Sequence, residues 1–173
     1  MPRTAGFCRF APIRPVTTPR RALLSGVKAE LPLLIGVLPF GLIFGVLAIG
    51  AGIEPMPAQA MSAIVFAGSA QFIAAQLVGA GTPATIIVLT IAIVNLRHAL
   101  YSASITPYLR GLSRSWKWGL AYLLTDETYA VTITRFQKAG DGSDGTEKRP
   151  TNGHWFYLGA GLAMWVTWQL STA

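Results

Sequence analysis

The chain has few charged residues and almost none of the side chains that build metal sites or disulfides. Only 12% of its 173 residues are Asp, Glu, Lys or Arg, whereas soluble domains carry about 25%. A single cysteine, Cys8, cannot form an intramolecular disulfide, and two histidines far from it make no metal-ligand cluster. No nucleophile and base are spaced as in a catalytic site. We therefore expect no metal, no cofactor and no enzymatic activity.

The little charge that is present lies between apolar stretches. The formal net charge is +7, and the hydrophobic share is 52%. Because the basic residues occupy the N-terminal region and the loops between apolar runs, they match membrane topology and do not indicate a nucleic-acid partner. The chain is therefore expected to be an integral membrane protein in contact with the lipid bilayer.

Residues 1–30 hold six of the 14 basic residues, and Glu30 is their only acid. Prolines interrupt residues 2–19, and the segment lacks the apolar core of a secretory signal. We interpret residues 1–30 as a basic, disordered cytoplasmic tail. An organellar transit peptide or an upstream start codon are the alternatives. Since the loop at 54–57 carries no basic residue, the N-terminus is expected in the cytoplasm.

Residues 31–173 are predicted to form an all-α, polytopic transmembrane domain with about five hydrophobic helical segments, some of them kinked or broken. At ~1.5 Å per residue, the first run is long enough to cross a ~30 Å hydrocarbon core. A polar loop at 137–153 separates the last two runs. The five runs cover residues 31–53, 58–81, 82–109, 118–136 and 154–172.

The first apolar run carries a stripe of small residues, with Gly41, Gly45 and Gly52 on one helical face. Such a stripe lets another helix backbone approach closely. Pro39 removes one backbone donor and is expected to kink the helix. These four residues are interpreted as packing or kink positions, and a kink that lines a transport path is the alternative.

The second run contains four small residues followed by an amide, in the sequence "FAGSAQF" at 66–72. Gly next to Ser is a place where helices bend or break, and transporters use broken helices to present backbone groups to a substrate. Gly68, Ser69 and Gln71 are therefore candidates for a transport path. The alternative is a packing notch in which Gln71 bonds across helices.

The third run places Asn95, Arg97 and His98 at membrane depth, where polar groups are costly and functional by default. On a helix, Asn95, His98 and Ser102 share one face, and Arg97 points about 100° away. The alternative is that Arg97 snorkels to an interface. Residues 82–109 either cross the membrane once or fold back as a re-entrant hairpin.

Arg97 needs a partner of opposite charge, and Asp126 or Glu127 in the fourth run can supply it. A carboxyl group in a dry site can take up a proton, so either acid could couple transport to a proton gradient. The alternative is an acidic pair that faces water at a helix end.

Four stretches stand out in this order along the chain: "PFGLIFG" (39–45), "FAGSAQF" (66–72), "NLRHALYSAS" (95–104) and "TDETYA" (125–130). Together they resemble the AzlC family, the large subunits of two-component branched-chain amino acid exporters. The resemblance implies a multi-pass permease of the bacterial inner membrane with a small AzlD-type membrane subunit, branched-chain amino acids as substrate and the proton motive force as driving force. Family members continue beyond residue 173, so the domain is expected to be partial, and residues 1–20 have no counterpart.

The function expected from these features is export of branched-chain amino acids. The alternative is a membrane channel or scaffold subunit that does not transport, in which the polar groups only hold helices together. The residues expected to line the transport path are Gly68, Ser69, Gln71, Asn95, Arg97, His98, Asp126 and Glu127.

Overall fold

The computed structural model describes residues 18–140 and 152–173, and these are helical with no strand among them. The first part of the predicted tail, residues 1–17, lies outside the described residues. In chain order the helices are α1 (Pro19–Gly50), α2 (Pro55–Val65), α3 (Gly68–Gly79), α4 (Ala84–Val94), α5 (Leu96–Ile105), the short 3-10 helix η1 (Thr106–Leu109), α6 (Arg114–Tyr122), α7 (Asp126–Gly140) and α8 (Gly153–Thr172).

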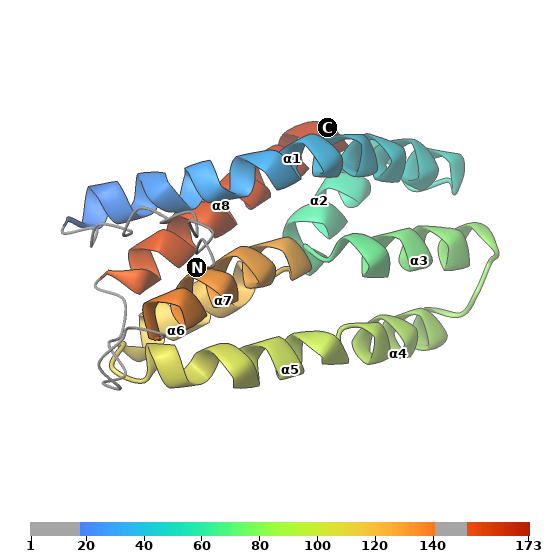
Figure 1. Ribbon diagram of the computed structural model, residues 1–173. Coiled ribbons are helices and arrows are strands. Elements are labelled where there is room, and N and C mark those ends of the chain that lie inside the picture. Colours follow the sequence, from blue (N-terminus) through green and yellow to red (C-terminus); the bar gives the residue numbers. More distant parts are fainter. Residues whose placement is uncertain (1–17, 141–151) are drawn as a thin grey trace, which may run out of the picture.

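The predicted all-α class is confirmed, and all five apolar runs are helical (Figure 1). The first run lies in α1 and the last in α8. Each of the three runs between them is divided: the second into α2 and α3, the third into α4 and α5, and the fourth into α6 and α7. Broken helices are therefore the rule in the middle of this chain.

The first helix begins well before the first apolar run. Thr18 has extended backbone angles and accepts a hydrogen bond from the Arg21 N–H at 3.4 Å, and Pro19 occupies the first helical position, where its missing N–H costs nothing. The prediction of a disordered tail through residue 30 is therefore wrong for residues 19–30. The helix continues through Pro32 and Pro39.

α1 packs along most of the length of α8, and small residues bring the two backbones together. A Cβ on Gly45 would lie 2.8 Å from the carbonyl oxygen of Thr172, and one on Gly41 would collide with Ser171. Gly52 does not share this role. It lies in the turn after α1 with φ +79°, and an added Cβ would have nothing within 4 Å. The prediction for Gly52 is wrong because it assumed a helix that continues to residue 52, whereas α1 ends at Gly50.

Two further glycines, which the sequence stripe did not include, make the closest approaches to the backbone of the other helix. A Cβ on Gly26 of α1 would collide with the backbone oxygen of Phe156, and one on Gly159 of α8 would collide with that of Leu23. The contact is therefore made by small residues on both helices, as is common where helices pack in membranes.

Two helical hairpins enter the molecule from opposite ends (Figure 1). α2 runs inward from the end where α1 finishes, and α3 returns to that end, whereas α6 and α7 do the same from the other end. Their tips meet in the middle. The hydroxyl of Tyr122, at the end of α6, donates to the carbonyl oxygen of Ala63 in α2, and the rings of Tyr122 and Phe66 are 5.9 Å apart.

α4 and α5 form an almost continuous rod along one side of the hairpins (Figure 1). Asn95, between them, keeps near-helical angles (φ −81°, ψ −3°), and its N–H donates to the Ile91 carbonyl at 3.0 Å. Residues 84–109 therefore run on in one direction. The interpretation of this run as a re-entrant hairpin is wrong, and the hairpins belong to the second and fourth runs.

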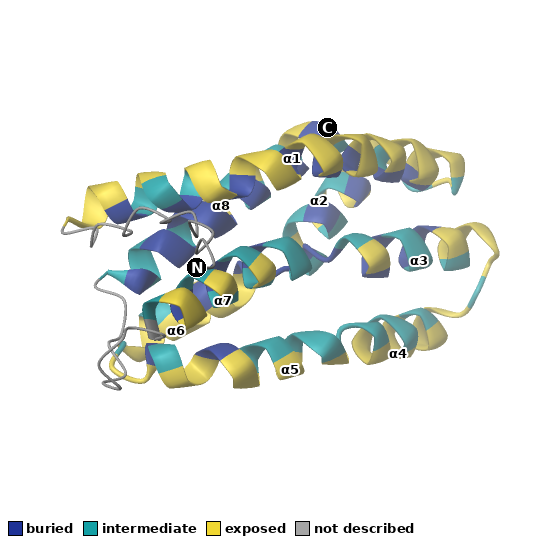
Figure 2. Cartoon of the chain, viewed as in Figure 1, coloured by how far each residue is buried: buried dark blue, intermediate teal, exposed yellow. Residues whose placement is uncertain are grey.

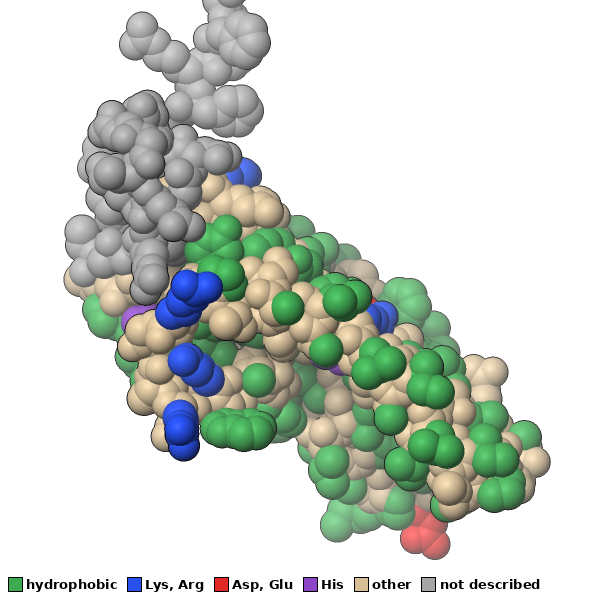
Figure 3. All heavy atoms as spheres, turned by 90° about the horizontal axis from the view of Figure 1, so that it is seen from below, with side chains coloured by type: hydrophobic (Ala, Val, Ile, Leu, Met, Phe, Trp, Pro, Cys, Tyr) green, Lys and Arg blue, Asp and Glu red, His purple; other side chains and the backbone are tan. Residues whose placement is uncertain are grey.

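Apolar side chains cover the outside of the molecule, and several polar ones are enclosed. Ile35 and Val46 of α1 are 76% and 73% exposed, and none of the described residues of α4 is buried (Figure 2). The face in Figure 3 is largely hydrophobic, with basic side chains gathered toward one end. Pro19–Gly50 and Ala84–Leu109 are long and apolar enough to cross a membrane. This arrangement suits a lipid surround. Glu30, Ser62, Gln71, Thr128 and Thr132 are fully buried.

Candidate functional site

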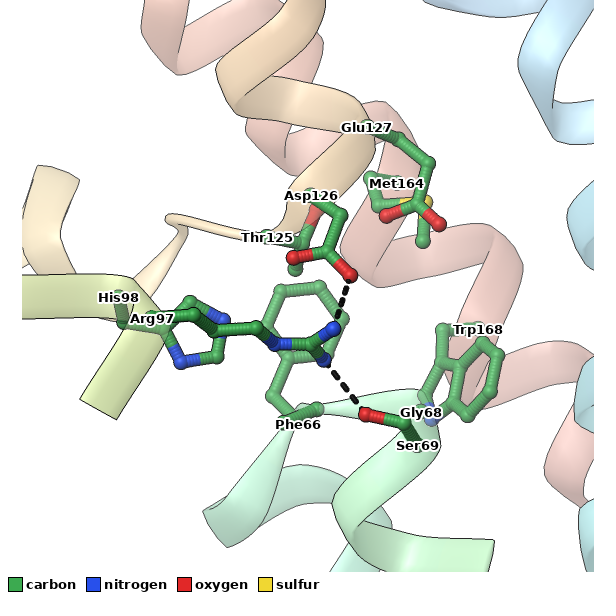
Figure 4. Close-up of a pocket in the computed structure, with 11 residues that line it drawn as sticks. Phe66, Gly68, Ser69, Arg97, His98, Thr125, Asp126, Glu127, Met164 and Trp168 are labelled. Carbon is green, nitrogen blue, oxygen red and sulfur yellow. Dashed lines mark hydrogen bonds and ion pairs between the residues drawn. The ribbon is translucent and has the colours of Figure 1, made fainter. Parts of the chain in front are cut away.

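The candidate site is a small cavity where the tips of the two hairpins meet the start of α5. Its volume is about 60 Å³. Figure 4 shows its side chains converging from α3, α5, α7 and α8. The lining residues are Phe66, Ala67, Gly68, Ser69, Arg97, His98, Thr125, Asp126, Glu127, Met164 and Trp168.

The break between α2 and α3 exposes the start of α3 to this cavity. Phe66 has left-handed backbone angles (φ 41°, ψ 45°), which large residues seldom adopt, and Ala67 is extended. No side chain caps the N-terminus of α3. The first backbone N–H groups of α3, at Gly68 and Ser69, therefore give this wall of the cavity a partial positive charge.

The break between α6 and α7 has the opposite charge. The Thr125 hydroxyl caps α7 by accepting the N–H of Thr128 at 3.3 Å. Asp126 and Glu127 follow in the first turn, where the helix dipole favours negative side chains. This capping sequence explains why a helix restarts in the middle of an apolar run.

Arg97 joins the two breaks. Its Nη1 lies 2.7 Å from Oδ2 of Asp126, and its Nη2 donates to Oγ of Ser69 at 2.6 Å (Figure 4). The ion pair expected from the sequence is present, with Asp126 as the partner, so the guanidinium does not snorkel away. The side chains of Arg97 and Asp126 are 30% and 40% exposed, and a pair this open contributes about 1 kcal/mol or less to stability.

The pair leaves hydrogen-bonding capacity unused. Nε of Arg97 and Oδ1 of Asp126 are both buried and have no partner among the described residues. Buried polar atoms are nearly always paired, so one donor and one acceptor are available beside the cavity.

Of the polar residues in the third run, Arg97 and His98 line the cavity, whereas Asn95 and Ser102 do not. The sequence predicted that His98 shares a helix face with Asn95 and that Arg97 points elsewhere. In the structure it is Arg97 and His98 that border the cavity together. Neighbours on a helix are 100° apart, and the cavity is wide enough to meet both. The His98 ring also packs edge-on against Tyr101, with centroids 5.9 Å apart.

Gln71 lies behind the cavity and does not line it. It is fully buried, and its Oε1 accepts a hydrogen bond from Nε1 of Trp168 at 3.1 Å. The Trp168 ring lines the cavity and lies 3.1 Å from where a Cβ on Gly68 would stand. Trp168 is only 4% exposed, and it was not among the residues expected to line the transport path. Thr125 and Met164 were also missed.

An apolar groove of about 470 Å³ adjoins the cavity and shares Gly68, Ser69, Glu127 and Trp168 with it. Its other lining residues are Val37, Phe40, Phe72 and Ile73. Ligand pockets typically measure ~300–1,000 Å³, so the polar cavity alone is smaller than such a pocket, and the groove is within the range. Together they form a hollow that is polar at one end and apolar at the other.

Comparison with known proteins identifies one family. The family described as "AzlC protein" matches residues 32–173. The chain is 27% identical over 150 residues, 86% of its length, to 58% of the inner membrane protein YgaZ of Escherichia coli (strain K12). It is 32% identical over 114 residues, 65% of its length, to 44% of the branched-chain amino acid transport protein AzlC of Bacillus subtilis (strain 168).

A membrane protein of Helicobacter pylori (strain ATCC 700392 / 26695) is 34% identical over 123 residues, which are 69% of the chain and 52% of that protein. The chain thus spans about half the length of the curated relatives that it matches. No solved structure matches it.

Proposed function

The chain belongs to the AzlC family of membrane proteins, and on that basis we propose that it is the large permease subunit of an exporter of branched-chain amino acids. The observation that carries the proposal is the meeting of two oppositely charged helix starts at one cavity: the uncapped N-terminus of α3 and the acidic first turn of α7. This arrangement is suited to a zwitterion.

The polar cavity would bind the two charges that every amino acid carries. Its carboxylate would bind to the N–H groups at the start of α3 and to Arg97, because helix N-termini and guanidinium groups both bind anions. Its ammonium would lie near Asp126 and Glu127, which line the same cavity. Discontinuous helices in other transporters bind substrate at the membrane midplane in this way.

The groove would select the side chain. Val37, Phe40, Phe72 and Ile73 form walls without a hydrogen-bonding side chain, so a substrate gains from burying an aliphatic group there and loses from burying a polar one. Leucine, isoleucine and valine have a zwitterionic head and a branched aliphatic side chain, which match both parts of the hollow.

The rest of the proposal concerns the setting. We place the protein in the bacterial inner membrane with its N-terminus in the cytoplasm, working with a small AzlD-type membrane subunit and driven by the proton motive force. The relative whose name mentions branched-chain amino acid transport and the relative named as an inner membrane protein support this setting.

The test is efflux of labelled leucine from cells that express the chain with its AzlD-type subunit and lack their own leucine exporters. Export should also make these cells resistant to toxic leucine analogues. Arg97→Ala and Asp126→Asn should each abolish efflux, whereas Arg110→Ala, at an exposed loop position, is a matched control that should retain it. If well-expressed Arg97→Ala and Asp126→Asn export normally, the site is wrong. If no apolar amino acid moves, the channel or scaffold function replaces the exporter.

A further inference from the structure

Glu30 is the most deeply buried charged residue in the described part of the chain, and none of the roles above uses it. Its side chain is 0% exposed, and neither Oε1 nor Oε2 has a hydrogen-bond partner among the described residues. An ionised carboxylate in such a place would be far more costly to bury than a neutral one. The enclosed Glu30 is therefore a carboxylic acid that holds a proton.

The position of Glu30 connects it to the site. It lies two helical turns before Val37, which lines the apolar groove, so about 10 Å of α1 separates the two. Glu30 thus lies on α1 between Val37 at the central hollow and the start of the helix at Pro19.

Few ionisable groups lie on the helices that pack around Glu30. α2 and α3 contain no ionisable side chain, and α8 contributes only His154 and Tyr157, near its start. α7 carries the ionisable residues Asp126, Glu127, Tyr129, Arg135 and Lys138. Arg135 and Lys138 line a surface groove whose α1 wall includes Ala29, the residue before Glu30, but neither makes a hydrogen bond to the Glu30 carboxyl group.

Glu127 borders both the cavity and the apolar groove. Glu30 is enclosed and lines neither of them. An ionisable side chain buried in a membrane span near a transport path is a candidate for binding and releasing protons.

We infer that Glu30 is a proton-binding site that releases and takes up its proton as the cavity fills and empties. When the proton leaves, the O–H bond of Glu30 breaks, the proton passes to a water molecule, and the electron pair of that bond stays on the Glu30 carboxylate, with no change in oxidation state. The coupling of this exchange to substrate rests on the proposed function, but the proton on Glu30 does not.

Infrared spectroscopy of the purified protein in lipid nanodiscs tests the proton directly. The carboxylic-acid C=O band should be present at neutral pH, should disappear in Glu30→Gln and should persist in Glu54→Gln, a control at an exposed loop carboxylate. Glu30→Asp keeps a carboxyl group in the same place and should retain a band at a shifted frequency, which keeps the test decisive if the Gln variant does not fold. A neutral-pH band that Glu30→Gln leaves unchanged would overturn the inference.

Transport in proteoliposomes that also contain the AzlD-type subunit tests the coupling. Glu30→Gln should retain leucine exchange in the absence of a pH gradient and should lose the additional accumulation that a gradient drives, whereas Glu54→Gln should keep both. Gradient-driven accumulation at the unmodified level in Glu30→Gln would overturn the coupling, with the exporter function intact. If the infrared band behaves as expected but no variant moves leucine, the proposed function fails and the proton site stands.

Discussion

Arg97 and Asp126 meet at 2.7 Å between Nη1 and Oδ2, and this contact joins the middle of one broken span to the first turn of another. The same guanidinium binds Ser69, in the first turn of α3. One side chain from the α4–α5 rod therefore holds both hairpin tips. A hairpin cannot move away from the centre without breaking one of these two contacts, so Arg97 stabilises the conformation in which the tips are closed.

The Arg97–Asp126 contact should be measurable as a coupling between the two residues. Arg97→Ala, Asp126→Ala and the double variant should form a thermodynamic cycle with a coupling free energy of roughly 1 kcal/mol, because the pair is partly exposed. Thermal unfolding in one detergent provides the measurement. The pair Arg110→Ala and Asp126→Ala is the control and should be additive. Additive effects of Arg97→Ala and Asp126→Ala would show that the contact does not stabilise the fold.

Replacing one partner of the buried hydrogen bond between Trp168 and Gln71 should lower the unfolding free energy more than replacing both partners. Gln71→Leu leaves the indole N–H unpaired and should lower the unfolding free energy by about 1–3 kcal/mol. Adding Trp168→Phe removes the unpaired donor and should recover much of that loss. Gln76→Leu, on an exposed turn of the same helix, is the control. Equal instability of the single and double variants would contradict this account.

The contact between α1 and α8 should not tolerate a methyl group where the two backbones meet. A Cβ on Gly159 would collide with the backbone oxygen of Leu23, so Gly159→Ala should destabilise the protein by about 1–3 kcal/mol. Gly36→Ala adds the same atom to the exposed face of α1 where nothing lies within 4 Å, and it should be neutral or slightly stabilising. The thermal midpoints of the two variants give the comparison, and equal midpoints would show that the helices can separate without cost.

The apolar groove should set substrate size. Ile73→Phe narrows the groove and should lower the efflux rate of leucine relative to alanine by about tenfold, since a few methylene groups account for that much discrimination. Ile64→Phe makes the same change at a side chain that is 76% exposed and should leave the ratio unchanged. The measurement is efflux of the two labelled amino acids from the same cells. An unchanged ratio in Ile73→Phe would place the side-chain pocket elsewhere.

The sequence predicted the helical class and the run at which one hairpin breaks, because both depend on local composition. Gly68 and Ser69 favour a helix less than alanine or leucine does, and the chain breaks just before them, between Phe66 and Gly68. The partner of Arg97 was also predictable, because the described chain offers few acids at that depth.

What the sequence could not show depends on packing between distant helices. Trp168 looks like an interfacial tryptophan until α3 is placed beside it. Glu30 looks like part of a solvated tail because it precedes the apolar run, but its side chain is 0% exposed in the folded chain. Asn95 suggested a turn, although a neutral amide with its N–H bonded to Ile91 can remain within a rod. The capping sequence at Thr125 was the local signal that could have placed the second hairpin.

The opposed hairpins have an electrical consequence. α2 and α3 are 11 and 12 residues long, about 16–18 Å at ~1.5 Å per residue, or roughly half of a ~30 Å hydrocarbon core. A charge held at the tips therefore lies about halfway through the membrane field. An elementary charge that moves between the tips and either surface crosses about half of the field, worth roughly 1.2 kcal/mol per 100 mV.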